Sequence, residues 1–182
     1  MIAIDPTIDW TISVALALIF VASAVMKLID LNEFHGAVEN YRIVPEQISG
    51  LVAGAVPIAE IAGAIGLMLP ATHRSAAMLL SMLLIVFTAS IAINLLRGRR
   101  NIDCGCFGPA LRQQLSWWLP ARNAAMIAML AIVMLPATER PLAPLDIATI
   151  AFAAATLAVL YSAANYLVAN APHLRALEIA DA

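Results

Sequence analysis

Charged residues are scarce in this sequence of 182 residues, and that scarcity excludes most soluble proteins. Only 12% of the residues are Asp, Glu, Lys or Arg and 63% are hydrophobic, whereas a soluble domain carries about 25% charged residues. The net charge of −2 provides no broad basic surface, so we expect no nucleic-acid partner. The composition predicts an integral membrane protein, for which the lipid bilayer is itself a partner.

Long polar stretches are also lacking, because five hydrophobic runs take up most of the chain. A membrane-spanning helix needs about 20 mostly apolar residues, and the fourth run is the shortest of the five. We predict an all-α integral membrane protein, a four-helix transmembrane bundle plus a fifth transmembrane helix, in a single transmembrane domain over residues 1–182. The expected spans are residues 9–29, 49–69, 73–96, 119–136 and 144–170.

The residues before and after the first span each allow a structural prediction. Residues 1–9 contain no Lys or Arg, although a cleavable signal peptide begins with a positively charged region. We therefore expect the first span to stay in the protein. In the stretch that follows, Phe34, Val38 and Tyr41 recur at helical spacing, which predicts a short amphipathic helix at the membrane interface.

An odd number of spans places residues 30–48, the loop 97–118 and the C-terminal tail on one side of the membrane. The ends of the spans that carry Lys27, Arg122 and Asn123 lie on this same side. Eight Lys and Arg residues lie there and two lie on the other side. Taken by itself, the positive-inside rule predicts that the side with the loop 97–118 is cytoplasmic.

Cysteine is almost absent, and the two that occur, Cys104 and Cys106, lie in the sequence CGCFG within the loop 97–118. A disulfide between residues so close together is strained, and strained, exposed disulfides exchange readily with other thiols. Nearby arginines favour the thiolate, which is the attacking species, whereas Asp103 opposes its formation. We predict that Cys104 and Cys106 are the catalytic residues of a thiol–disulfide exchange, although the residues alone leave open whether the chain is an enzyme.

Two other interpretations of the cysteines remain open, namely a pair of inert thiols and one half of a zinc site. Structural zinc takes four ligands, and only His35, His73 and His173 are available besides the cysteines. His73 lies on the other side of the membrane in the expected topology. We therefore predict no metal site.

Glu60 lies near the middle of the second span, where a charge is costly and indicates function by default. The other interpretation is a polar clamp between helices, in which Glu60 is protonated or hydrogen-bonded to Ser13, Ser23 or Asn94. The clamp is slightly favoured. Glu60 is therefore a candidate for a supporting role and not for the exchange chemistry itself.

Three further polar residues at span ends are candidates for supporting roles. Lys27 closes the first span and can snorkel to the interface, which is the interpretation we prefer. Arg122 and Asn123 open the fourth span. They can anchor that helix at the interface, or Arg122 can lie beside the cysteine loop and stabilise a thiolate or a bound partner; the two interpretations are evenly matched.

Several motifs occur in an order that resembles one family. The first helix ends in KL, YRIVP precedes the second span, a glutamate lies within that span, and RN opens the helix after CGCFG. Together they resemble the methylamine-utilisation MauE family of small integral membrane proteins, which is related to DoxX-like proteins. The resemblance covers nearly the whole chain and implies a multi-pass protein of the bacterial inner (cytoplasmic) membrane that serves one-carbon metabolism.

The resemblance implies a role in maturing the disulfide-rich β subunit of methylamine dehydrogenase, a periplasmic enzyme. It implies disulfide exchange between Cys104–Cys106 and MauD, a membrane-anchored thioredoxin-like protein that then acts on the β subunit. The bundle also looks like vitamin K epoxide reductase, which passes electrons to quinone, but the second cysteine pair of such enzymes is lacking. We predict no cofactor; a quinone suits the bundle but has no supporting motif.

The implied role requires a periplasmic cysteine loop, whereas the charge count predicts a cytoplasmic one. We follow the resemblance, because arginines around a thiolate have a role besides setting topology. The alternative function is a non-redox membrane scaffold that docks and stabilises the thioredoxin-like partner. Small residues of the second span, such as Gly54 and Gly63, would then form the docking face.

Overall fold

A computed structural model describes residues 3–99, 102, 114–138 and 140–180 of the chain, with side chains as far as Ala171. Within these ranges the chain forms helices and one isolated bridge between Ile4 and Ala137, without a β-sheet. The prediction of an all-α membrane protein is confirmed. The helices are α1 (Pro6–Ile29), α2 (Leu31–Tyr41), α3 (Glu46–Leu67), α4 (His73–Leu96), α5 (Trp118–Val133) and α6 (Pro144–Ala180).

Helix ends follow local hydrogen bonding more closely than the limits of the hydrophobic runs. Helix α1 begins three residues earlier than predicted, because the Asp5 carboxylate accepts a hydrogen bond from the Thr7 N–H (2.8 Å) and Pro6 suits a first turn. Helix α3 is displaced towards the N-terminus relative to the predicted 49–69, since it begins directly after Pro45. Helix α4 has the predicted bounds.

Helix α5 is shorter than the predicted span 119–136. It ends at Val133, because the chain tightens there and the Leu135 N–H donates to the Ile132 carbonyl (3.0 Å). Sixteen residues extend about 24 Å, less than the roughly 30 Å hydrocarbon layer. Four helices, α1, α3, α4 and α6 as far as Ala171, are long and apolar enough to cross a membrane, and α5 is the shorter fifth helix beside them.

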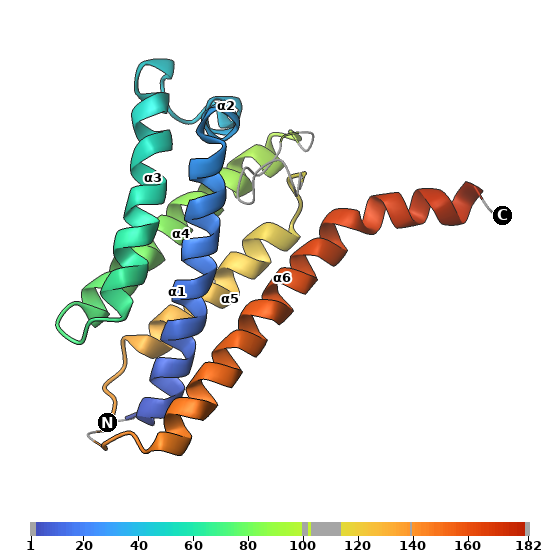
Figure 1. Cartoon of the computed structure of the whole chain (residues 1–182). Helices are drawn as coiled ribbons and strands as arrows, with labels where there is room; N and C mark the ends of the chain where they lie inside the picture. The colour runs from blue at the N-terminus through green and yellow to red at the C-terminus, as the bar shows by residue number, and fades with distance from the viewer. Residues whose placement is uncertain (1–2, 100–101, 103–113, 139, 181–182) are drawn as a thin grey trace.

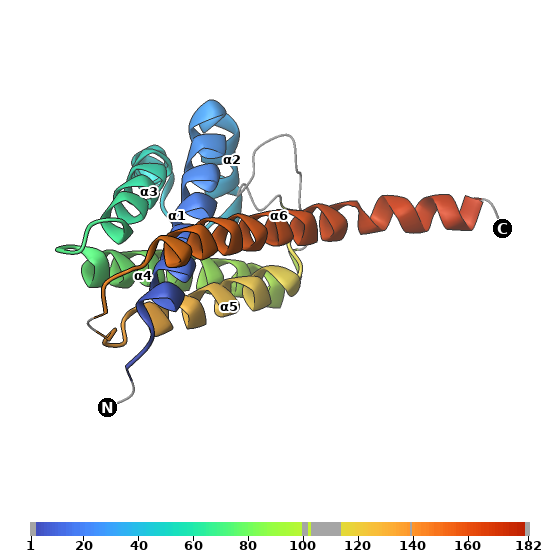
Figure 2. The same cartoon turned by 60° about the horizontal axis from the view of Figure 1, so that its bottom comes forward.

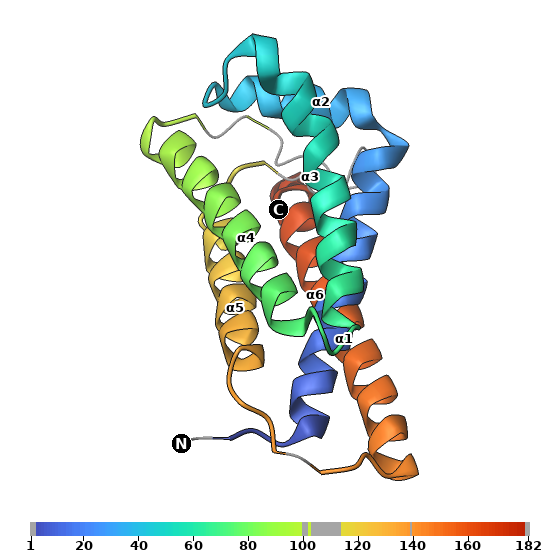
Figure 3. The same cartoon turned by 90° about the vertical axis from the view of Figure 1, so that its left-hand side faces the viewer.

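Helix α1 is the centre of the bundle and contacts α3, α5 and α6, while α4 contacts α3 and α5 (Figures 1 and 3). The α3–α4 turn, the end of α5 and the start of α6 lie at the same end as the N-terminus. Helix α2, the end of α4 and the start of α5 lie at the opposite end. The described flanks of the cysteine loop are therefore at the α2 end, where Lys27 also lies.

Helix α2 confirms the helix predicted from Phe34, Val38 and Tyr41, and all three side chains are buried. Its apolar face contacts protein: Phe34 and Val38 form a cluster with Ala53 of α3, and Phe87 of α4 lies against it. The amphipathic pattern of α2 therefore reflects its packing against α3 and α4 at one end of the bundle.

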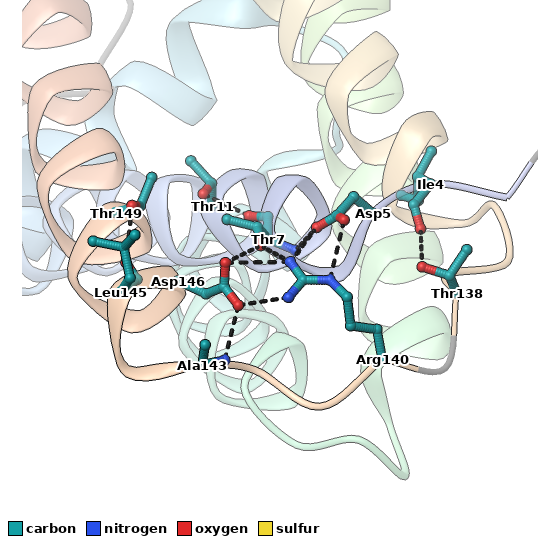
Figure 4. A network of polar contacts seen from close by, with 10 residues as sticks. All are labelled: Ile4, Asp5, Thr7, Thr11, Thr138, Arg140, Ala143, Leu145, Asp146 and Thr149. Carbon is teal, nitrogen blue, oxygen red and sulfur yellow. Dashed lines mark hydrogen bonds and ion pairs between the residues drawn. The ribbon is translucent and has the colours of Figure 1, made fainter.

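Helix α6 is attached to the bundle on one side, along α1, and its C-terminal turns extend past the other helices (Figures 1 and 2). Its start is held by Arg140, whose guanidinium donates to Asp146 (2.7 Å), to Asp5 (3.1 Å) and to Thr7 (2.9 Å), as Figure 4 shows. The Arg140 guanidinium and the Thr7 N–H lower the pKa of the Asp5 carboxyl below its ordinary value of 3.8. This network joins the N-terminus to the loop before α6.

The glycines of α3 differ in what surrounds them. A Cβ atom on Gly63 would lie 2.5 Å from Cδ2 of Leu80, a fully buried residue of α4, whereas a Cβ on Gly54 would meet nothing within 4 Å. Gly63 therefore permits close packing of α3 on α4, and Gly54 faces open space.

We expect Gly63→Ala to lower the free energy of unfolding by about 1–3 kcal/mol, because the added methyl overpacks the α3–α4 contact. Gly54→Ala is the matched control on the same helix and should be neutral or slightly stabilising. Equilibrium unfolding in mixed detergent micelles measures both. Equal losses in the two variants would contradict this assignment.

Candidate functional site

The most polar part of the described interior is an ion pair between helices α1 and α3. Lys27, in the last turn of α1, is 2% exposed and its ammonium bonds Oε1 of Glu60, which is 3% exposed. The ammonium also donates to the Ser23 hydroxyl (2.9 Å), one turn earlier on α1, and that hydroxyl lies 3.5 Å from the same Glu60 oxygen. Carboxylate, ammonium and hydroxyl therefore form one hydrogen-bonded group.

Aromatic rings complete the surroundings of the Lys27 ammonium. Its Nζ atom lies 5.4 Å from the ring centre of Phe34 and 5.2 Å from that of Phe87. Ring faces attract a cation most strongly where water is excluded. The preferred prediction that Lys27 snorkels to the interface is therefore wrong, because an ion pair and two rings hold its charge inside the protein.

Arg122 organises a second polar group, in which α5 meets α6. Its Nη1 donates to the Asn165 side-chain oxygen (2.8 Å), its Nε and Nη2 lie 3.4 Å from the Asn123 oxygen, and its guanidinium lies 5.6 Å from the Tyr161 ring centre. Asn123 in turn donates to Thr88 of α4 (3.1 Å). Both Arg122 and Asn123 are buried, so they link helices inside the bundle and are not interfacial anchors.

The two polar groups face one small cavity. Its volume is about 30 Å³, which is enough to hold a water molecule. Lys27, Glu60 and Arg122, three of the candidates for supporting roles, therefore lie around one cavity. The lining side chains come from α1, α3, α4, α5 and α6, namely Ile19, Phe20, Ser23, Lys27, Glu60, Leu84, Phe87, Arg122, Asn123, Met126 and Tyr161.

Asn94 fixes the end of α4 that leads into the cysteine loop. It is fully buried, and its amide group donates to the carbonyls of Tyr41 (3.1 Å) and Ser90 (3.0 Å). Its side-chain oxygen accepts from Arg99 Nη1 (3.2 Å), and its carbonyl accepts from the Arg99 N–H (3.0 Å). Gly98, with φ of +75°, makes the reversal between them feasible. The chain is therefore folded back onto α4 directly before the cysteine motif.

Cys104 and Cys106 lie outside the described residues, but the residues on either side of them meet. The Leu115 N–H donates to the Ile102 carbonyl (3.1 Å). Leu115 belongs to a buried cluster with Tyr41, Leu95 and Leu119, among others, and Ile102 packs against it. The segment that carries the cysteines therefore leaves and returns at one point of the α2 end of the bundle.

The sequence named most of these residues but few of their partners. Glu60 bonds Ser23, one of three predicted neighbours, while its pairing with Lys27 was not predicted. Asn165 and Thr88 were not predicted to contact Arg122 and Asn123. The signal available for both was a polar side chain inside an apolar run, which marks a buried hydrogen bond but does not identify its partner.

These contacts suit a fixed polar core better than bond-making chemistry. The ammonium, the guanidinium and the carboxylate each touch groups from another helix, and they can hold water in the cavity between them. Among the residues described, no group of three or more His, Cys, Asp or Glu side chains is arranged to bind a metal ion. The prediction that the cysteines bind no metal remains a prediction.

Removing one member of the ion pair should be more harmful than removing both. We expect Lys27→Met or Glu60→Gln to lower the free energy of unfolding by about 3–5 kcal/mol, because each leaves a polar group in the bundle without its charged partner. A Lys27→Met/Glu60→Gln double variant should lose less than the sum of the two changes. Unfolding in mixed micelles measures the cycle, with Ser23→Ala as a milder control of about 1 kcal/mol. Additive losses would contradict the pairing.

Comparisons with known proteins agree on one family. A family model described as "Methylamine utilisation protein MauE" matches residues 5–136, a range that contains the ion pair, Arg122 and both cysteines, but not Tyr161 or Asn165. No solved structure matches the chain.

Three relatives named "Methylamine utilization protein MauE" match over most of their length. The protein of Paracoccus versutus is 44% identical over 165 residues, 90% of this chain and 88% of the relative. That of Paracoccus denitrificans is 43% identical over 166 residues, 90% and 89% of the two chains. That of Methylorubrum extorquens is 38% identical over 157 residues, 86% and 84%. The chain therefore belongs to the MauE family of methylamine utilisation proteins.

Proposed function

We propose that this chain is the membrane redox partner in maturation of the methylamine dehydrogenase β subunit. Cys104 and Cys106 exchange disulfides with the thioredoxin-like protein MauD, which then acts on the β subunit. The protein lies in the bacterial inner membrane with the cysteine loop in the periplasm. Membership of the methylamine utilisation family supports the pathway.

One structural observation supports the role proposed for the two cysteines. The only two cysteines of the chain lie between residues 102 and 115, whose backbones are joined by a hydrogen bond at the α2 end of the bundle. Asn94 and Arg99 hold the chain directly before this closure. A short segment with fixed ends, which contains two glycines and follows three arginines, suits the presentation of two thiols to a partner outside the membrane.

The exchange requires no group besides sulfur. A thiolate of the reduced pair attacks one sulfur of the oxidised partner, a mixed disulfide forms, and the displaced sulfur leaves as a thiolate. The second thiolate of the attacking pair then breaks the mixed disulfide. One pair gains a disulfide and the other gains two thiols, so electrons and protons balance without a cofactor. We propose no resident quinone, because the chain lacks the second cysteine pair that quinone-linked enzymes of this kind use.

The bundle supports this chemistry from a distance. Lys27, Glu60 and Arg122 hold α1, α3, α5 and α6 together, and α4 and α5 carry the two ends of the cysteine segment. In this proposal the ion pair and Arg122 are positioning residues, and the exchange itself belongs to the two sulfur atoms.

Replacing Cys104 or Cys106 by Ser should abolish maturation of the β subunit, because each sulfur is needed for one half of the exchange. Growth on methylamine and the disulfide content of the β subunit are the readouts. With one cysteine replaced, the other should be trapped in a mixed disulfide with the thioredoxin-like partner. Ser162→Ala, an exposed change on α6, is the control. Normal maturation in Cys104→Ser would favour the scaffold.

Accessibility of the cysteines tests the orientation. A membrane-impermeant maleimide applied to intact cells should label Cys104 and Cys106 only after mild reduction, as an outward-facing disulfide requires. The control is an Ala71→Cys variant in a background without the native cysteines, because exposed Ala71 lies in the α3–α4 turn at the other end of the bundle. It should react only after the cells are opened. The reverse pattern would put the cysteine loop in the cytoplasm and exclude direct exchange in the periplasm.

A further inference from the structure

A hollow in the described part of the protein lies at the end of the bundle opposite helix α2. Its volume is about 680 Å³, within the range of small-molecule sites. It is bounded by the start of α1, the α3–α4 turn, the first turns of α4 and the end of α5, with Asp9, Trp10, His73, Arg74, Met78 and Leu135 among its walls. No part of the proposed disulfide exchange uses it.

This pocket lies at the depth where a membrane changes from hydrocarbon to headgroups. The spans formed by α1 and α4 begin at Pro6 and His73, so the pocket is built from their first turns. Trp10 lies here, with its ring centre 5.4 Å from that of His73, and tryptophan is enriched at this level of a bilayer. A ligand in the pocket would thus touch both water and acyl chains.

Asp9, the buried acidic residue of the pocket, already lies against His73. His73 Nδ1 lies 2.7 Å from the Leu67 carbonyl, which only accepts, so Nδ1 carries a proton. His73 Nε2 lies 3.3 Å from both carboxylate oxygens of Asp9 and 3.4 Å from the Ser13 hydroxyl. The Asp9 carboxylate therefore already has a partner within the pocket wall.

Arg74 is the exposed charged side chain of the pocket wall. It makes no ion pair or hydrogen bond with any residue in the described part of the chain. The other side of the pocket is apolar, with Met78 59% exposed and Leu135 40% exposed. A cation beside an exposed apolar wall at headgroup depth matches a molecule with an anionic head and a hydrocarbon tail.

We propose that this pocket binds an acidic phospholipid of the leaflet opposite the cysteine loop. The lipid phosphate bonds the Arg74 guanidinium, and an acyl chain lies along Met78 and Leu135. Guanidinium groups bind phosphate through two parallel hydrogen bonds, and basic side chains at this depth favour acidic lipids. The site is independent of the proposed redox function.

Native mass spectrometry of the full chain in detergent tests the proposal, with phosphatidylglycerol and phosphatidylcholine added in separate titrations. Phosphatidylglycerol should bind more tightly, and Arg74→Gln should weaken it by about fivefold. Arg97→Gln, a matched loss of an exposed arginine at the other end of α4, should leave the affinity unchanged. Met78→Glu, which adds a negative charge to the wall along which the acyl chain lies, should weaken phosphatidylglycerol more than phosphatidylcholine.

Three outcomes would overturn the assignment. Equal weakening by Arg74→Gln and Arg97→Gln would mean that net charge, and not this pocket, attracts the lipid. Equal affinity for the two lipids in the unsubstituted protein would remove the acidic preference. Displacement of phosphatidylglycerol by millimolar inorganic phosphate would show that the site takes a free anion instead of a lipid.

Discussion

The ion pair between Lys27 and Glu60 is the contact on which the polar interior of this bundle depends. A charge inside the hydrocarbon layer is costly unless it has a partner, so Lys27 of α1 and Glu60 of α3 must stay level with each other. A shift of one helical turn, about 5.4 Å, would separate them. Helix α1 also contacts α5 and α6. Its position along the bundle axis relative to α3 therefore determines where these two helices can pack.

On the other side of the cavity, Arg122 is another buried charge that fixes neighbouring helices relative to each other. Its contacts with Asn165 and Tyr161 join α5 to α6, and Asn123 extends the group to Thr88 of α4. Helix α6 lies beyond the range matched by the family model, yet it supplies two of the groups around the Arg122 guanidinium. The polar core is thus completed by a helix that the family model does not cover, although the relatives align over 86–90% of the chain.

Hydrophobicity predicted the helices of this protein because long apolar runs have few other stable forms in a membrane, and Glu60 stood out for the same reason. Pairing could not be predicted in this way. Lys27 at a span end has the same pattern whether it snorkels or turns inward, and the direction depended on where α3 and Phe87 lie. Gly54 and Gly63 likewise look equivalent in sequence, although only Gly63 has Leu80 against it. The early end of α5 arises from a local turn at Leu135, which hydropathy does not register, and the roles of Cys104 and Cys106 remain predictions.

The hydrogen bond between Leu115 and Ile102 has a consequence for how this protein can vary. Because the two residues are joined and share one apolar cluster, the positions of α4 and α5 do not depend on the length or sequence of the chain between them. Doubling the length of such a closed loop costs only about 0.6 kcal/mol in chain entropy. Apart from the two cysteines, the residues between 102 and 115 can therefore change to suit a different partner while the buried charges stay as they are.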